Sequence, residues 1–514
     1  MSSKRIATLA AYALAATCSI SATSYGAGSW VNGQAATIVL GQGNFGAPSA
    51  TVSQSVTSHV GGVAVDPLTG KVFVSDSTSH RILRFSSANA LVSGSNAEVV
   101  FGQQNFTAVS SNAGGSTSAK SFFVPEQIHI DSGGRMWVAD RENHRVLRFD
   151  SASTKGTYAD ADAVLGQATM TASTANRGGQ TASNSLNKPI GVWHDGLALW
   201  VSDSGNNRVL AYGNPTIKPN GGTADIVLGQ QLMTTNGTGT TLSQMDSPSG
   251  LVVTDFGVMY LTDSDNHRVL RFNTVDTKGS GSSADGKLGV AGFPTSPLTM
   301  NRPTGVAADT AGRVYVADTN NSRVLVYNDA VNRLNSAPAD NVLGQPDLVT
   351  ALNANVTGYG PKALFSPTGL YFDAAANALW VGEYNDMRAV RFSPFNALLD
   401  IDLSGNPTKF DALTDGLLIV RYLFGLSNEP LTAGAIGATA NRTDPAQIKS
   451  YLDSIRPALD VDYDGKQDAL TDGILITRYM MGLRNAALVN SSVALGAQRN
   501  TAAAIQAYIQ SLMQ

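Results

Sequence analysis

An acidic residue followed five positions later by an arginine recurs through the first four hundred residues of the chain. Successive copies lie about sixty residues apart, and a fixed period of this length is typical of repeat architectures such as propellers and solenoids. The single feature therefore predicts a domain built from one unit used six times. The six pairs are Asp76 and Arg81, Asp140 and Arg145, Asp203 and Arg208, Asp263 and Arg268, Asp318 and Arg323, and Glu383 and Arg388.

Each repeat contains four short runs rich in Val, Leu, Ile, Phe and Tyr, separated by Asp, Gly, Asn and Ser. In one copy the runs lie at 303–309, 313–318, 322–327 and 341–345. This pattern predicts four antiparallel strands joined by turns. Four strands per repeat favour a six-bladed β-propeller, because a ring of four-stranded sheets leaves only short, protected edges.

The repeat resembles the NHL repeat, in which a glycine-led inner strand precedes an apolar strand ending in Asp, and Asn-x-Arg-Val opens the third strand. That last phrase stands at 143–146, 206–209 and 266–269. The resemblance covers roughly residues 35–395 and implies a mainly β fold. We therefore expect a six-bladed NHL-type propeller over residues 28–396.

The fourth-strand phrase Val-Leu-Gly-Gln indicates how the ring closes. A copy at 39–42 precedes the first blade, and none follows the sixth. Residues 36–42 are therefore predicted to supply the outer strand of the blade whose other strands lie within 369–393. Such closure would remove an unpaired edge that invites aggregation.

Most conspicuous side chains of the propeller have a structural interpretation. The acid–arginine pairs occur in every blade, so they are expected to tie strands together rather than to carry out one reaction. Inner-strand glycines suit a crowded axis. Three tryptophans share one second-strand position and are predicted to be core residues: Trp137, Trp200 and Trp380.

Histidines are where catalysis could reside, since NHL-like proteins include secreted lyases that use several histidines on a metal near the central channel. His80, His144 and His267 occupy one turn position, whereas His59, His129 and His194 lie near inner strands. His129 and His194 stand at adjacent strand positions, so they should point to opposite faces. No Ser/His/Asp, His-Glu-x-x-His or nucleophile-elbow pattern is present. A metal-dependent lyase or hydrolase remains the alternative to a non-catalytic binding protein.

The connectors from each outer strand to the next inner strand are long and polar, which elaborates one face of the propeller. Loops on a rigid scaffold are where recognition usually resides. Their Ser, Thr, Asn, Gln and Gly content favours an extracellular protein or polysaccharide as partner. The connectors are 43–60, 104–123, 168–187, 231–246, 291–301 and 346–365.

The amino terminus is typical of a secretory signal over residues 1–27. Lys4 and Arg5 precede an uncharged run at 6–16, followed by small residues, a pattern too short for a spanning helix. Cleavage would remove Cys18, the one cysteine of the chain; lipidation of Cys18 is the alternative. We expect a secreted or periplasmic protein without a transmembrane segment. A net charge of −4 argues against nucleic acid.

Residues 397–514 form a different, duplicated module. Oxygen-bearing side chains at alternating positions, a glycine at position 6 and a further carboxylate are what a calcium loop requires. The first loop supplies Asp400, Asp402, Ser404, Asp411 and Asp415. The second loop supplies Asp460, Asp462, Asp464, Asp468 and Asp472, together with the backbone carbonyl of Lys466.

These loops resemble the duplicated repeat of a dockerin type I module, an EF-hand-like calcium-binding unit. The resemblance implies a small all-α domain with helices at 414–426, 445–456, 471–483 and 501–513, and a cohesin-like partner. Both copies depart from the usual loop, because the closing acid stands one position later than usual. Loop 1 also carries three extra residues and a serine in place of an acid, so loop 2 is expected to bind Ca²⁺ more tightly.

Together these features predict a secreted, non-catalytic binding or scaffold protein. Its loop-rich propeller face would recognise a glycan or a protein. Its C-terminal module would serve calcium-dependent attachment or assembly.

Overall fold

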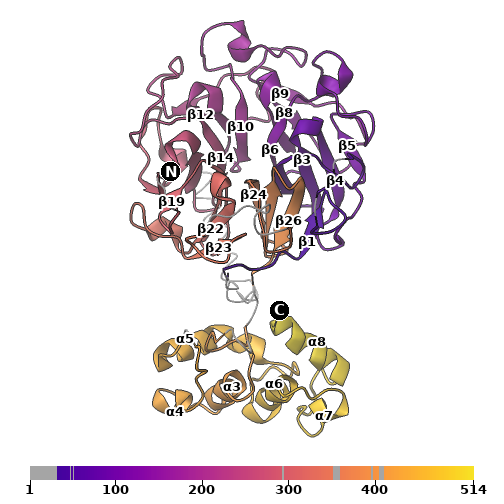
Figure 1. The fold of residues 1–514 in the computed structure, drawn as a ribbon, viewed down its shortest axis with the longest axis vertical. Helices are drawn as coiled ribbons and strands as arrows, with labels where there is room; N and C mark the ends of the chain where they lie inside the picture. Colours follow the sequence, from indigo (N-terminus) through magenta and orange to yellow (C-terminus); the bar gives the residue numbers. More distant parts are fainter. Residues whose placement is uncertain are drawn as a thin grey trace. The chain divides into compact units, whose positions relative to one another are not determined.

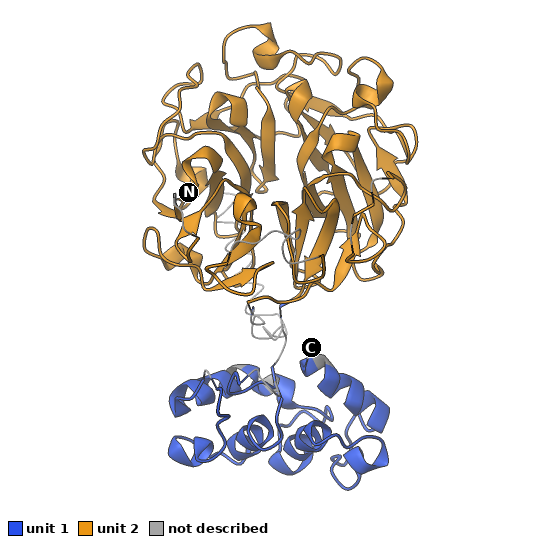
Figure 2. Ribbon diagram, in the orientation of Figure 1, with its two compact units in different colours: residues 1–30, 394–514 blue, residues 31–393 orange. Residues whose placement is uncertain are grey.

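The computed structural model describes residues 30, 32–46, 48–49, 51–291, 295–350, 359–394, 398–404, 410–440 and 442–513. The chain divides into two compact units, residues 31–393 and residues 394–514, the latter grouped with residues 1–30 (Figure 2). The predicted signal peptide lies outside the described residues.

The larger unit is a six-bladed propeller of four-stranded antiparallel sheets arranged around an axis (Figure 1). Blades 1 to 3 comprise β2 (Val60–Val65), β3 (Lys71–Asp76), β4 (Arg81–Ser87) and β5 (Val99–Phe101); β6 (Pro125–Ile130), β7 (Met136–Asp140), β8 (Arg145–Phe149) and β9 (Ala163–Leu165); and β10 (Pro189–His194), β11 (Ala198–Asp203), β12 (Arg208–Gly213) and β13 (Ile226–Leu228). The predicted repeat is thus one blade.

Blades 4 to 6 repeat the same plan. They comprise β14 (Pro248–Val253), β15 (Met259–Asp263), β16 (Arg268–Phe272) and β17 (Gly286–Leu288); β20 (Pro303–Ala308), β21 (Val314–Asp318), β22 (Arg323–Tyr327) and β23 (Asn341–Leu343); and β24 (Pro367–Asp373), β25 (Ala378–Glu383), β26 (Arg388–Phe392) and β1 (Ile38–Leu40). A short parallel pair, β18 (Val290–Ala291) and β19 (Thr299–Met300), follows the fourth blade.

The ring closes as the sequence predicts. Strand β1 pairs antiparallel with β26, and Val39 stands opposite Val390. Val39 and Leu40 are fully buried. The last blade therefore consists of strands from both ends of the unit, which leaves it with a complete four-stranded sheet.

Every inner strand begins with an irregular register, and this feature shapes the channel. In β6 the pairing with β7 shifts between Pro125 and Ile128, and the other five inner strands shift near the same point. Such bulges re-aim side chains locally. In all six blades the residue after the opening position lines one cavity: Gly61, Glu126, Ile190, Ser249, Thr304 and Thr368.

Glycines allow the inner strands to approach one another. A Cβ on Gly305 would lie 1.8 Å from the carbonyl oxygen of Thr368, and one on Gly369 would lie 2.5 Å from that of Gly61. Those separations are far below van der Waals contact. The predicted role of the inner-strand glycines at a crowded axis is confirmed at these positions.

The smaller unit is helical and internally duplicated. Its main helices are α3 (Asp415–Leu423), α5 (Pro445–Ile455), α6 (Ile474–Met480) and α8 (Ala502–Leu512), accompanied by the short α4 (Glu429–Thr432) and α7 (Ala486–Val489). Four helices were expected close to these places; α4 and α7 were not. Helix α6 begins later than expected because a π-helical turn, Ala469–Gly473, precedes it.

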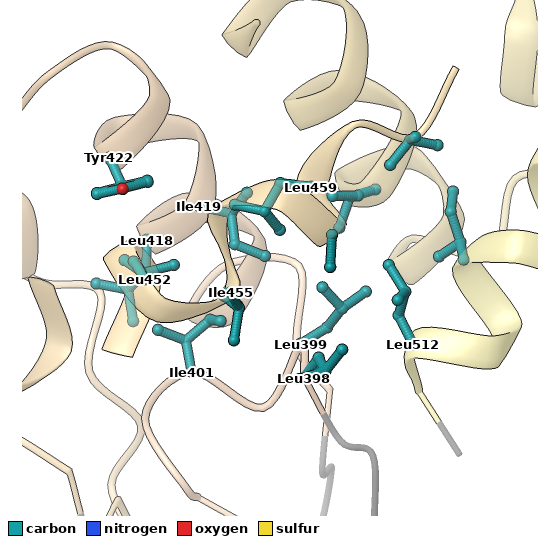
Figure 3. Close-up of a cluster of buried hydrophobic side chains, with 14 of the residues drawn as sticks. Leu398, Leu399, Ile401, Leu418, Ile419, Tyr422, Leu452, Ile455, Leu459 and Leu512 are labelled. Atoms are coloured by element: carbon teal, nitrogen blue, oxygen red, sulfur yellow. The ribbon is translucent and has the colours of Figure 1, made fainter. Parts of the chain in front are cut away.

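Apolar side chains from both copies share one core in this unit. Leu398 and Leu399 precede the first loop, and Leu418 and Ile419 of α3 meet Leu452 and others in the same cluster (Figure 3). The two copies therefore stabilise each other by hydrophobic burial. Among the helices of the described residues, none combines the length and apolarity needed to span a membrane.

Candidate functional site

The acid–arginine pairs are buried clamps that fix the long connectors. In all six, the arginine Nε donates to the carboxylate over 2.7 to 2.9 Å. The guanidinium of Arg81 also donates through Nη2 to the carbonyls of Ser53, at 3.1 Å, and Val56, at 2.8 Å. Arg388 donates to the carbonyl of Phe45 at 3.2 Å, so the last clamp reaches the first connector. The structural interpretation of these pairs is confirmed.

The second oxygen of each paired carboxylate holds the entry to an inner strand. The Phe123 N–H donates to Asp140 Oδ1 at 2.7 Å, and the Asn187 N–H donates to Asp203 Oδ1 at 2.6 Å. Each clamp therefore joins a turn, a connector and a strand entry through charge-assisted hydrogen bonds, which are about twice as strong as neutral ones. Within the described residues, the clamps therefore hold parts of each connector against the blades.

Three of the histidines join neighbouring blades. Nδ1 of His80, His144 and His267 accepts the backbone N–H of Val124, Lys188 and Arg302, respectively, over 3.0 to 3.1 Å. In blade 3 the same position is Asn207, whose Oδ1 accepts the Ser247 N–H at 3.0 Å. Since an amide oxygen replaces the ring nitrogen in one blade, the contact is structural.

The remaining histidines belong to none of the groups of side chains placed to hold a metal ion among the described residues. His59 Nδ1 lies 2.6 Å from the hydroxyl of Thr78, His129 packs against Trp193 with ring centroids 4.2 Å apart, and His194 stacks over Trp137. Burial lowers the pKa of His129 to about 3. Among the described residues, the groups of three or more side chains placed to hold a metal ion all lie in the helical unit.

A cavity of about 350 Å³, lined by both apolar and polar residues, opens at the channel on the loop-rich face. Its wall includes inner-strand residues and, from the turns of that face, Arg141, Asn320 and Tyr384. Glu126 presents a carboxylate there, with its side chain about one-fifth exposed at 21%. Burial raises the pKa of Glu126 to about 7, against the opposing effect of Arg141.

Sequence reasoning missed Glu126, although the repeat contains the signal. Aligned on the proline or valine that opens each inner strand, the next residue is Gly61, Ile190, Ser249, Thr304 or Thr368 in the other blades. Blade 2 alone places a charge there. It also has Gln127 where the others have glycine, and Gln127 Nε2 donates to the carbonyl of Leu251 in blade 4 at 3.3 Å.

The helical unit brings predicted calcium ligands together in two groups. Asp400, Asp402 and Asp415 form one group, and Asp460, Asp462 and Asp464 form the other, with one carboxylate oxygen of each residue within 4.8 Å of the others. The turn of the second loop depends on Gly465, whose φ is +86°, a conformation that glycine adopts without strain. Gly405 lies outside the described residues.

The closing acids make the same contacts in both copies. Asp415 Oδ1 accepts the Ile401 N–H at 2.5 Å, and Oδ2 accepts the Asp411 N–H at 3.0 Å. The matching distances at Asp472 are 2.6 Å from Val461 and 2.9 Å from Asp468. The closing acid, which stands one position later than usual, therefore has the same geometry in both copies. Burial raises the pKa of Asp415 to about 7 and that of Asp472 to about 6.

The other predicted ligands lie at the edges of these groups. Asp411 and Asp468 each accept the backbone N–H two residues ahead at 2.7 Å, and at Asp468 this contact caps the π-helical turn Ala469–Gly473. The Ser404 N–H donates to Asp402 Oδ1 at 3.0 Å, and the Lys466 N–H donates to Asp464 Oδ1 at 2.8 Å. In both copies, therefore, backbone N–H groups of the loop donate to its own aspartates.

The donor set fits a hard cation, and one oxygen lacks a partner. Asp462 is fully buried; its Oδ2 accepts the Ala494 N–H at 2.7 Å, whereas its Oδ1 has no hydrogen bond among the described residues. An unpaired buried carboxylate oxygen is costly unless a cation compensates it. Carboxylate and carbonyl oxygens are the ligands that Ca²⁺ prefers.

Comparison with known proteins concerns the propeller. Residues 47–291 match the family model of the teneurin NHL domain, and residues 300–327 match that of the NHL repeat. Mouse teneurin-3 is 24% identical over 308 residues, 53% of this chain and 11% of that protein. Mouse NHL repeat-containing protein 3 is 29% identical over 202 residues, 37% of this chain and 50% of that protein.

A solved streptogramin B lyase is also similar, with a TM-score of 0.39 and 11% identity over 66% of this chain and 95% of the lyase. A similarity at that level does not indicate that this chain shares the activity of the lyase. The chain spans half or less of the length of the two mouse relatives. The matches and the six observed blades establish an NHL-repeat domain with the six-bladed propeller fold.

Proposed function

We propose that this NHL-repeat propeller protein is a secreted, non-catalytic binding protein with a calcium-dependent module for attachment. Its loop-rich face recognises a glycan or a protein. Its C-terminal helical unit anchors or assembles the molecule through a dockerin-like surface, with a cohesin-like protein as the expected partner. The proposed export is supported by residues 1–27, whose sequence pattern is typical of a secretory signal.

The clamped connectors are the observation that carries this proposal. The buried arginines donate to connector carbonyls, and these contacts favour a preorganised arrangement of the described parts of the connectors. A preorganised surface loses less entropy on binding. The channel cavity on that face provides a recess for a ligand group.

The two acid groups support the calcium role. Asp400, Asp402 and Asp415 would hold one ion with Ser404 and Asp411, and Asp460, Asp462 and Asp464 would hold the other with Asp468, Asp472 and the Lys466 carbonyl. Bound Ca²⁺ would compensate carboxylates that are crowded and buried, which couples metal binding to folding. Loop 2 has the larger number of acids and is the tighter site in this proposal.

A glycan and protein array probed with the purified chain in millimolar calcium tests the recognition function. We expect capture of a restricted set of ligands, and loss of capture when residues of the loop-rich face are exchanged. Absence of capture from both arrays would contradict the proposal.

Metal analysis separates the binding protein from a metal-dependent lyase or hydrolase. After removal of residues 397–514, the propeller of a binding protein should retain no stoichiometric metal. Stoichiometric metal in the propeller, together with turnover that depends on it, would favour the enzyme instead.

A further inference from the structure

The channel cavity offers hydrogen-bond acceptors and few donors at its inner-strand wall. Thr368 Oγ1 donates to the Val60 carbonyl at 2.6 Å, and Thr319 Oγ1 donates to the Pro367 carbonyl at 2.8 Å. The hydroxyl of Thr304 lies 2.7 Å from that of Thr319; when Thr319 donates to Pro367, Thr304 is the donor of this pair. Because these protons are committed, the lone pairs of the three hydroxyls are what remains for a ligand.

A carboxylate completes this acceptor surface, and a glycine makes room for it. A Cβ on Gly61 would lie 2.2 Å from Ser77 Oγ and 2.8 Å from Glu126 Oε2, so glycine at that position leaves room for the carboxylate in its observed place. The nearest cation among the described residues is Arg141, whose Nη1 lies 3.9 Å from Glu126 Oε1, beyond hydrogen-bond distance, and 3.3 Å from Glu142. The Glu126 charge is therefore incompletely compensated.

These features select the chemistry of the ligand. We propose, resting on the binding function above, that the channel cavity receives a primary ammonium group, and that Glu126 is the residue that recognises it. An ammonium brings three N–H donors and one positive charge, which match the hydroxyl oxygens and the carboxylate. A calcium ion fits less well, because it takes six to eight oxygen ligands, usually with several carboxylates, and Glu126 supplies one.

The rim indicates what carries the ammonium group. Arg141 and Arg302 both line the cavity, and the Arg302 side chain is half exposed at 54% while pairing with Asp265. Guanidinium groups donate to carbonyls and repel additional positive charge. A peptide presents one lysine among many carbonyl acceptors, whereas a de-N-acetylated glycan is positive at every sugar. The carrier is therefore a lysine side chain of a protein.

The test uses the full chain and a blocked, fluorescent Gly-Gly-Lys-Gly-Gly peptide, with the Nε-acetyl-lysine peptide as the matched ligand. Fluorescence anisotropy should show binding of the lysine peptide and at least about tenfold weaker binding of the acetylated one, the scale expected when a partly buried charge pair is lost. Glu126→Gln, which keeps the shape and removes the charge, should weaken the lysine peptide by at least about tenfold.

Glu142→Gln is the matched control, since it removes the same charge beside Arg141 but outside the cavity wall. Glu142 has a side chain of similar exposure, 22% against 21% for Glu126, but does not line the cavity, so the change should alter the affinity by less than about threefold. Circular dichroism verifies that both variants fold. Equal binding of the two peptides, no binding of the lysine peptide, or an unchanged affinity in Glu126→Gln would each overturn the inference.

The two proposals fail in distinguishable ways. Array ligands whose capture survives Glu126→Gln would contradict the ammonium site and leave the loop-face function intact. Binding of chitosan oligomers, but not of the lysine peptide, would overturn the choice of a protein carrier. No capture of any ligand would contradict both.

Discussion

The two units of this protein both bury carboxylates but compensate them differently. In the propeller each of six buried acids contacts an arginine at 2.7 to 2.9 Å. In the helical unit Asp402, Asp415, Asp462 and Asp472 accept backbone N–H groups and form no ion pair within the described residues. The propeller thus pairs these six acids with arginines, and we propose that the helical unit compensates its acids with a bound cation.

This difference predicts different dependences on solution conditions. A buried charge with a hydrogen-bonded partner is stable in itself, whereas an uncompensated one opposes folding until a proton or a metal arrives. The propeller should therefore be insensitive to calcium, and the helical unit should fold with it. Both units repeat one contact in every copy. In the propeller it is the acid–arginine pair, and in the helical unit it is the backbone contact of the closing acid.

Loss of the closing strand should have the largest effect on the propeller. Removing residues 28–43 takes away two fully buried side chains, Val39 and Leu40, and an outer strand, so we expect a loss of at least about 5 kcal/mol. Denaturant unfolding measures it. Leu40→Asp should also destabilise strongly, whereas Leu68→Asp, on an exposed side chain, should not; an unchanged melt after the deletion would mean that β1 does not close the ring.

Breaking one clamp should come next. Arg208→Ala leaves Asp203 buried without its cation, which costs about 3–5 kcal/mol. Lys278→Ala breaks an ion pair of similar length, 2.8 Å to Asp285, near the surface, and should cost about 1 kcal/mol or less. Denaturant unfolding of both variants gives the two losses in unfolding free energy, and a larger loss for Arg208→Ala is expected. Equal small losses would show that the buried pairs are dispensable.

The effect of one substitution on the stability of the helical unit should change sign when calcium is added. Asp462→Asn removes a buried charge with an unpartnered oxygen, so in chelator it should stabilise the helical unit by about 1–2 kcal/mol. In millimolar calcium the same change should destabilise that unit, because a ligand is lost. Asp203→Asn should destabilise the propeller in both conditions. Destabilisation by Asp462→Asn in chelator as well would contradict the crowding that we describe.

Acid should weaken the blade contacts by a smaller amount. Burial lowers the pKa of His80 and His144, so the folded protein holds both rings neutral where the unfolded chain, with a pKa near 6.5, binds protons. Stability from these groups is present above that pKa and falls as the pH falls below it.

The matched variant replaces both histidines with the residue that blade 3 uses. His80→Asn and His144→Asn keep an acceptor at a left-handed position that asparagine tolerates, so the double variant should lose about 0.5–1 kcal/mol less than wild type between pH 7.5 and 5.5. Chemical unfolding in saturating calcium gives both values. Identical losses in the two proteins would show that the histidines do not set the acid sensitivity.

Features that repeat were predictable from the sequence, and features that break the repeat were not. The six pairs and the extra Val-Leu-Gly-Gln phrase gave the blades and their closure, because each follows from strand pairing alone. The place of Glu126 in the cavity wall was not predictable, because it depends on which inner-strand residues line the cavity. The register shift at the start of β6 alters that pattern locally. The shared contacts of Asp415 and Asp472 likewise depend on how each loop folds back onto its helix.

Hydrogen–deuterium exchange of the full chain, in chelator and in millimolar calcium, tests the central contrast most directly. We predict that amides of residues 410–440 and 442–513 become strongly protected on adding calcium, while those of the propeller strands from β2 to β26 exchange at the same rates in both buffers. Exchange that is unaffected by calcium throughout the helical unit would contradict the account, as would calcium-dependent protection of the propeller core.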